Sequence, residues 1–258
     1  MTNFVEVTEL ADDEVANEQI ERVRTRYAWA LGHSHGRDVL EVACGTGPGL
    51  GLIATQARSL VAGDISDEIL AKARAHYGSR IDIRRMDAMA LPFADQSLDV
   101  VIIFEALYYV PDASRFVAEC ARVLRPGGKV LVSNANKDLY DFNASPHSHV
   151  YHGVVELERL FATANFSTEF WGDVAVSAVS WRQKLLRPIK TLVVSLGLMP
   201  KSMAGKKLLK RLFFGQMQAF PREIGASPPP SAERLARLPA GVADRQHKVV
   251  LCAATLQS

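Results

Sequence analysis

The sequence contains few cysteines and no long apolar run. Its three cysteines, Cys44, Cys120 and Cys252, are odd in number and widely spaced within apolar stretches. This pattern is typical of reduced core residues and argues against a disulfide framework. No apolar stretch reaches the length of a membrane-spanning helix, and no cationic start precedes a hydrophobic run. We therefore expect a cytoplasmic protein without a signal peptide.

One segment lacks acidic residues altogether. Residues 174–222 hold ten Lys or Arg and no Asp or Glu, so the remainder holds 20 basic against 28 acidic residues. The net charge of +2 thus combines a strongly basic segment with an acidic body, which indicates a separate role for the segment. Basic residues without interleaved aromatic side chains make a poor nucleic-acid groove, so we do not expect nucleic acid as a partner.

The predicted elements alternate between strand and helix along the chain. Strands are expected at 39–43, 60–64, 81–84, 98–104, 129–133, 167–173 and 246–256, and helices at 14–31, 50–60, 67–77, 112–124 and 154–165. Residues 32–36 are predicted to be a linker, Ser66 a helix N-cap and Gly78 a helix stop. This alternation predicts an α/β fold, a mainly parallel sheet with helices on both faces.

A glycine turn follows the first predicted strand. Gly45 and Gly47 separate that strand from the helix expected at 50–60. A strand, a glycine turn and a helix present backbone N–H groups to a ligand, and glycine leaves room for its close approach. Asp64 and Asp87 end the next two strands, where a carboxylate can accept both hydroxyls of a ribose. The arrangement predicts a nucleoside site.

These residues resemble the class I S-adenosylmethionine-dependent methyltransferases, in particular the small-molecule group that includes ubiquinone- and menaquinone-biosynthesis enzymes. The resemblance covers residues 19–170 and the last strand. It implies a Rossmann-like, doubly wound, seven-stranded sheet whose last strand is antiparallel and inserted between the fifth and sixth. Ala43 departs from the family pattern, which has glycine there, and adds only a methyl group.

The resemblance also implies which residues bind S-adenosyl-L-methionine. Glu41 would orient the glycine turn and the methionine end, Asp64 would take the ribose hydroxyls, and Asp87 with Ala88 would reach the adenine. Arg26 stands beside Tyr27, a pair that often lies over the cofactor in this family. The expected cofactor-binding residues are Tyr27, Glu41, Ala43, Gly45, Gly47, Asp64, Ile65, Asp87, Ala88 and Phe104.

A hydroxyl acceptor must lose its proton near neutral pH, a task that suits histidine. His147, His149 and His152 lie in the long polar loop after the fifth strand, which ends on the ligand side of the sheet. We expect His149 as the catalytic base, followed by His152 and Glu105. No metal site is expected.

Residues 1–178 and 241–258 are predicted to form the cofactor-binding domain, and residues 179–240 a helical insertion before the last strand. The cations of residues 206–214 alternate with leucines and phenylalanines at helical spacing. The insertion either forms a helical cap whose charges are solvated, or also covers the acceptor pocket and attracts an anionic, saccharide or lipid-linked acceptor. Contact with an anionic membrane surface is a variant of the second hypothesis.

The expected function is methyl transfer to a small molecule, as an O-methylation. A non-catalytic binding protein with the same fold is one alternative. A nicotinamide-dependent oxidoreductase is another, although the Gly-x-Gly-x-x-Gly pattern is absent from the turn, because Leu50 and Leu52 occupy its third position. The identity of the acceptor and the oligomeric state stay open.

Overall fold

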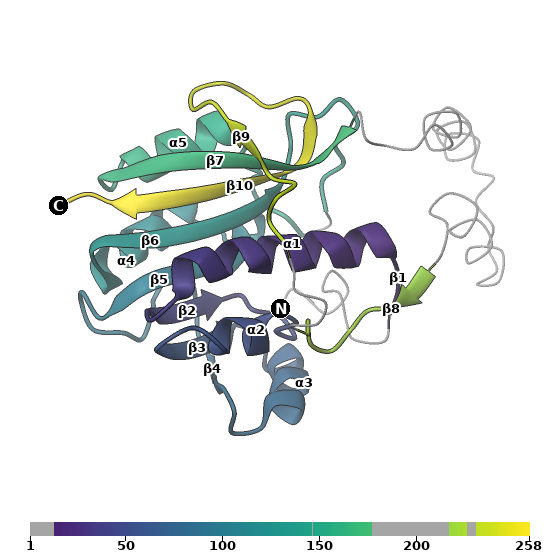
Figure 1. The fold of residues 1–258 in the computed structure, drawn as a ribbon. Coiled ribbons are helices and arrows are strands. Elements are labelled where there is room, and N and C mark those ends of the chain that lie inside the picture. The colour runs from purple at the N-terminus through teal and green to yellow at the C-terminus, as the bar shows by residue number, and fades with distance from the viewer. Residues whose placement is uncertain (1–12, 146, 177–216, 226–230) are drawn as a thin grey trace.

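The computed structural model describes residues 13–145, 147–176, 217–225 and 231–258. An eight-stranded sheet runs through the molecule, with strand order β4-β3-β2-β5-β6-β10-β7-β9 (Figure 1). The strands are β2 Asp38–Val42, β3 Ser59–Asp64, β4 Asp82–Arg85, β5 Leu98–Phe104, β6 Leu124–Ala135, β7 Phe166–Ala175, β9 Ala236–Leu238 and β10 His247–Leu256. β10 lies between β6 and β7 and is antiparallel to both, as the resemblance implied. The edge strand β9, antiparallel to β7, is one strand more than predicted.

Helices cover both faces of this sheet (Figure 1). The helices are α1 Asn17–Ser34, α2 Leu50–Ala54, α3 Asp67–Tyr77, α4 Ala113–Val123 and α5 Val154–Ala162, with a short 3₁₀ helix at Leu107–Tyr109. One core cluster joins the sheet to α1 and α2, and another joins its opposite face to α4 and α5. The Rossmann-like α/β prediction is confirmed.

β5 shows why an uninterrupted apolar run becomes a central strand. Successive side chains of a strand point to opposite faces, so a strand covered on both sides must be apolar throughout. Val100, Ile102 and Phe104 pack on the α1 side, whereas Val101 and Ile103 pack on the α4 side. The predicted bounds of this strand agree with the structure.

Side chains and a glycine define the ends of α3 and α4, with Ser66 and Gly78 in the predicted roles. Ser66 caps α3 by accepting a hydrogen bond from the Ile69 backbone N–H, and Asp112 caps α4 in the same way through the Arg115 N–H. Gly78 ends α3 with a φ of 55°, a conformation that favours glycine. The three cysteines are free and buried, as predicted.

Several element boundaries differ from prediction, among them those of β6, which runs from Leu124 to Ala135 rather than over 129–133. The helix expected at 50–60 ends at Ala54, because Ser59 and Leu60 pair with β2 and so lie in β3. Residues 32–34 of the predicted linker belong to α1, whose last residue is the buried Ser34. At the other end, the short strand β1 (Glu14–Ala16) replaces the expected helical start.

The described parts of the predicted insertion contain two strands. β9 extends the main sheet, and β8 (Met217–Ala219) pairs with β1 in a separate two-stranded ribbon. The helical pattern expected at 206–214 lies outside the described residues. Within the described part of the chain, no helix combines the length and apolar character that crossing a membrane requires.

Candidate active site

A cavity of about 570 Å³ opens at the carboxyl ends of β2, β3, β4 and β5. The loops that follow these strands line most of it, and the N-terminal half of α1 closes one side. Ligands of doubly wound sheets bind at this edge, and the volume is in the range of pockets for small molecules and cofactors.

The glycine turn after β2 has an unusual backbone. Ala43, Gly45 and Gly47 all have positive φ angles, of 54°, 60° and 73°. A side chain at Gly47 would collide with Leu50, so the turn admits no Cβ there. Alanine tolerates this region at a cost of about 1–2 kcal/mol, which explains why the family pattern prefers glycine at position 43.

Asp64, at the tip of β3, holds the turn from the neighbouring strand. Its Oδ2 accepts a hydrogen bond from the Gly45 N–H at 3.0 Å, and its Oδ1 accepts one from the Ser66 N–H at 3.0 Å. Burial raises the pKa of this carboxyl, and the two backbone donors oppose that rise. A buried carboxylate with remaining lone pairs that lines a cavity suits a ligand with neighbouring hydroxyl groups.

We expect Asp64→Ala to weaken S-adenosylmethionine binding by roughly 1–3 kcal/mol, because buried hydrogen-bonding groups lose their partner. Titration calorimetry measures this change. Asp67→Ala, three residues on in an exposed position, is the matched control and should bind like the parent. Parental affinity of the Asp64 variant would contradict a nucleoside site at this strand tip.

A buried pair beside the turn has an unfilled hydrogen-bonding position. The Tyr27 hydroxyl donates to Glu41 Oε1 at 2.6 Å, while Glu41 Oε2 is buried and has no partner among the described residues. Burial raises the pKa of Glu41 to about 7, although the Tyr27 hydrogen bond and the charge of Arg26 act in the opposite direction. A buried carboxyl group with one unfilled acceptor position therefore lies directly behind the glycine turn.

Glu41 should make the stability of the cofactor-free protein depend on pH. Its folded pKa of about 7 exceeds the ordinary 4.5, so the folded state binds more protons between these values and stability falls as pH rises through them. We expect the parent to lose, relative to Glu41→Gln, on the order of 1–3 kcal/mol across this window. Denaturant unfolding at several pH values measures the difference. Glu68→Gln, at an exposed position, should follow the parent, and a Glu41→Gln profile parallel to the parent's would refute the idea.

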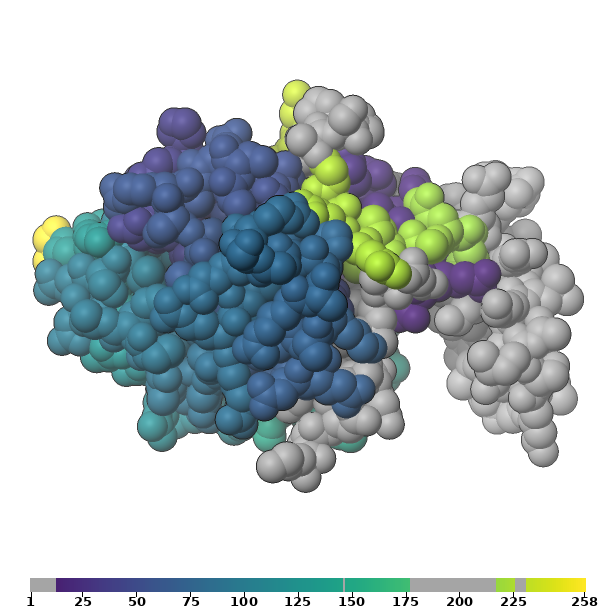
Figure 2. All heavy atoms as spheres, turned by 90° about the horizontal axis from the view of Figure 1, so that it is seen from below, coloured from purple at the N-terminus to yellow at the C-terminus, as the bar shows by residue number. Residues whose placement is uncertain are grey.

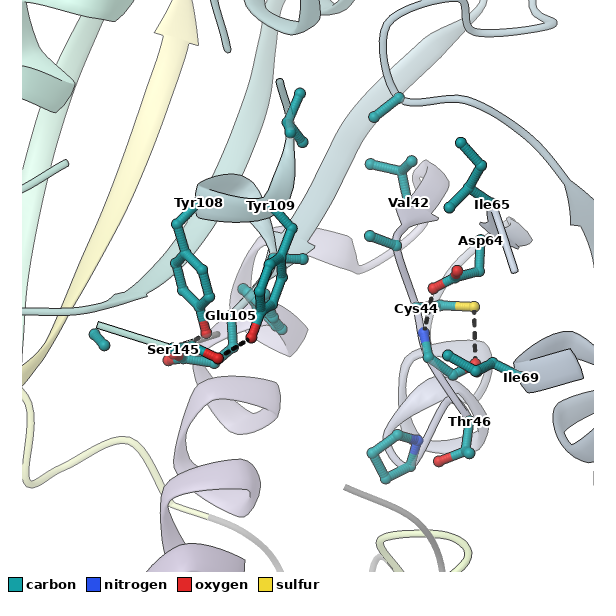
Figure 3. Close-up of a pocket in the computed structure, with 18 of the residues that line it drawn as sticks. Val42, Cys44, Thr46, Asp64, Ile65, Ile69, Glu105, Tyr108, Tyr109 and Ser145 are labelled. Atoms are coloured by element: carbon teal, nitrogen blue, oxygen red, sulfur yellow. Dashed lines mark hydrogen bonds between the residues drawn. The ribbon is translucent and has the colours of Figure 1, made fainter. Parts of the chain in front are cut away.

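The opposite side of the cavity is aromatic (Figure 3). Tyr108 stacks on Tyr151 with ring centroids 4.2 Å apart, and the Tyr109 hydroxyl shares a 2.6 Å hydrogen bond with Ser145 Oγ. Ser145 in turn donates its backbone N–H to the Tyr151 hydroxyl at 3.0 Å. These contacts tie the loop after β6 to the 3₁₀ helix after β5 and form one wall of the cavity.

Glu105 is the acidic residue in this aromatic half. Its carboxylate accepts hydrogen bonds from Ser133 Oγ at 2.8 Å and from the Tyr108 hydroxyl at 3.4 Å. Its φ of 51° is rare for a non-glycine residue, and such strain clusters at functional sites. Burial, together with the charge of Glu105, raises the pKa of Tyr108, so this phenol stays protonated and donates.

The structure brings most of the expected site residues together around the cavity. Those that line it are Ala43, Gly45, Asp64, Ile65, Asp87, Ala88, Phe104, Glu105 and His149. Tyr27, Glu41 and Gly47 lie behind this lining, and His152 does not line it either. His149 is exposed at the rim, whereas burial lowers the pKa of His152.

Further lining residues were not among the predicted site residues. They include Arg22, Tyr108, Tyr109, Ser145, Tyr151 and Phe220. For Tyr108 and Tyr109, the position just after a central strand was an available signal. For Phe220 the sequence carried none, because it follows β8 and lies far along the chain from the glycine turn.

The glycine turn and the strand-tip acids lie in a segment that matches a known family. A family model described as "Methyltransferase domain" matches residues 40–132, which contain the glycine turn, both strand-tip acids and Glu105. Residues 40–132 thus match a methyltransferase domain, and a curated relative of the chain is named a probable S-adenosylmethionine-dependent methyltransferase.

Two curated relatives each match about half of the chain. A Mycolicibacterium smegmatis protein named "Probable S-adenosylmethionine-dependent methyltransferase" is 41% identical over 138 residues, covering 52% of this chain and 53% of its own length. The 27-O-demethylrifamycin SV methyltransferase of Amycolatopsis mediterranei is 34% identical over 131 residues, covering 48% of each chain. The chain therefore spans about half the length of these relatives.

Solved structures extend the similarity of fold to nearly the whole chain. A chain from a Haloferax volcanii complex of the methyltransferase activator Trm112 with its methyltransferase gives a TM-score of 0.59 at 16% identity. The match covers 93% of this chain and 94% of that one. At this identity the likeness concerns the fold alone.

Proposed function

We propose that the protein transfers the methyl group of S-adenosylmethionine to a hydroxyl group of a small-molecule acceptor. The observation that carries this proposal is one cavity with two different ends. One end has a glycine turn and a strand-tip carboxylate, and the other has a fixed carboxylate among tyrosines.

The cofactor end of the cavity follows from the residues already described. Asp64 would take the ribose hydroxyls, Asp87 and Ala88 the adenine edge, and Ile65, with 46% of its surface exposed, an apolar face of the ring. Glu41, which lies behind the cavity lining, would orient the glycine turn. When bound, S-adenosylmethionine supplies a methyl group on a positively charged sulphur, which is electrophilic without further activation.

The chain's own task is then to orient the acceptor and receive its proton. Positioning contributes much of the rate of such a displacement, because two reactants are held in line. We assign the proton to Glu105, because Ser133 and Tyr108 fix its carboxylate and leave lone pairs for an acceptor hydroxyl. His149, exposed at the rim, is the second candidate, and His152, outside the cavity lining, is the third.

The acceptor is proposed to be a small molecule with a ring or an apolar surface. The stacked Tyr108 and Tyr151 offer a flat face for such a group. Arg22, which lines the cavity from α1, supports the earlier expectation of an anionic or saccharide-linked acceptor. The name of the Amycolatopsis mediterranei relative, a 27-O-demethylrifamycin SV methyltransferase, supports a hydroxyl acceptor.

The test of this proposal incubates the protein with labelled S-adenosylmethionine and a cell extract that serves as the source of acceptors. We expect label from S-adenosylmethionine to move into a small molecule of a cell extract and to depend on active protein, with the product identified by mass spectrometry. Cofactor binding without any labelled product would favour the alternative of a non-catalytic methyltransferase-fold binding protein. Binding of NAD in place of S-adenosylmethionine would favour the oxidoreductase alternative.

A further inference from the structure

Residues 217–225, here called the strap, cross the molecule beside the cofactor half of the cavity. The strap begins as β8, which pairs with β1 at the start of α1. Figure 2 shows it, in green, running between the purple N-terminal residues and the blue region of α3. Along the way Phe220 donates its N–H to the Asp13 carbonyl at 2.8 Å, and Ile224 donates its N–H to the Pro48 carbonyl at 2.6 Å.

Phe220 is the residue of the strap that reaches the cavity. Its side chain is 1% exposed and packs in the core cluster with Val23 and Tyr27 of α1. Phe220 lines the cavity together with Pro48 of the glycine turn. The strap therefore supplies one wall of the space proposed for the methionine end of the cofactor.

Glu223 anchors the far end of the strap to α3 and the residues just after it. Its Oε2 lies 2.7 Å from His76 Nε2 and 2.9 Å from Arg80 Nη2. Three-quarters of its side chain is buried, which raises its pKa, but hydrogen bonds with Arg80 and His76 hold the pKa of this carboxyl below the ordinary value. A Cβ at Gly51 would collide with Glu223 Oε1, so α2 leaves room for this carboxylate by having glycine there.

We propose that Glu223 is a positioning residue of the cofactor site. Through Arg80 and His76 it holds the strap against α3, and the strap in turn holds Phe220 and Pro48 against the bound S-adenosylmethionine. Glu223 need not touch the cofactor. This inference rests on the proposed function, because it requires the cavity to bind S-adenosylmethionine.

The test reverses the charge of the anchor. Glu223→Lys places a cation beside Arg80 and His76. The strap should then move away from α3 in a large share of molecules. We expect the dissociation constant for S-adenosylmethionine to rise by about five- to twentyfold, mostly through faster dissociation. Titration calorimetry and stopped-flow displacement by S-adenosylhomocysteine measure the two quantities. Glu233→Lys, the same change at an exposed position outside the strap, is the control and should bind like the parent.

A charge swap separates positioning from general damage to the fold. Arg80→Glu combined with Glu223→Lys restores an ion pair with the opposite polarity and should return the affinity to within about threefold of the parent. Parental affinity of Glu223→Lys, or a swap that fails to rescue a loss, would overturn the role of Glu223. A parent that does not bind S-adenosylmethionine would instead contradict the proposed function itself, and the inference with it.

Discussion

Gly45→Val is expected to abolish detectable S-adenosylmethionine binding. Gly45 lines the cavity and has a φ of 60°, while its N–H donates to Asp64. A β-branched side chain is strained in this region of φ, and at this position it would also occupy the ligand's space. Calorimetry should show no heat of binding at cofactor concentrations that saturate the parent.

Gly36→Val is the control that separates the two effects of Gly45→Val. Gly36 has a φ of 66°, close to that of Gly45, yet a Cβ there would meet nothing within 4 Å. It does not line the cavity. This variant therefore carries the same backbone strain and should bind the cofactor with parental affinity. If Gly45→Val has the same stability to unfolding as Gly36→Val and still binds S-adenosylmethionine, the glycine turn is not part of the cofactor site.

Glu105→Gln should lower kcat about 10²–10⁴-fold, the usual effect of losing a general base. The amide has the shape of the carboxylate. Its oxygen can accept from Ser133 Oγ and its NH2 group can donate to the Tyr108 hydroxyl, so the wall of the cavity should persist. Cofactor affinity should stay at the parental value, because the reaction loses only its proton acceptor. Single-turnover rates with labelled S-adenosylmethionine, measured with the acceptor found in the extract, give the change.

His149→Ala is the natural comparison for Glu105→Gln. We expect a smaller loss from it, since His149 is exposed at the rim. If His149→Ala lowers kcat more than Glu105→Gln does, the acceptor's proton goes to His149. In that case the base expected from the sequence, His149, is the correct one. His152→Ala should leave turnover nearly unchanged.

Local sequence patterns predicted the parts of the fold that depend on local physics. The apolar run of β5 and the cap and stop residues of α3 were sufficient, because burial on both faces and capping are decided within about ten residues. The strand-tip acid Asp64 and the glycine turn could be expected at one edge, because parallel strands end on the same side.

Other features depend on pairing between distant segments, and the sequence does not signal it. α2 is short because Ser59 must meet Asp38 across the sheet. The stacking of Tyr108 on Tyr151 joins the 3₁₀ helix after β5 to the loop after β6, and the wall at Phe220 depends on pairing between β8 and β1. No periodicity within either partner encodes these contacts.

The central position of β10 has a consequence for the order in which the protein folds. During synthesis β6 and β7 are made first, and each keeps an unpaired edge until residues 247–256 emerge, when Thr255 pairs with both Lys129 and Ser167. Contacts of such long sequence separation form slowly, and exposed strand edges recruit other chains meanwhile. The strands that end at the cofactor cavity, β2 to β5, pair with one another and form no pairs with β10. A nascent chain can therefore complete its cofactor strands while the rest of the sheet still depends on protection from aggregation.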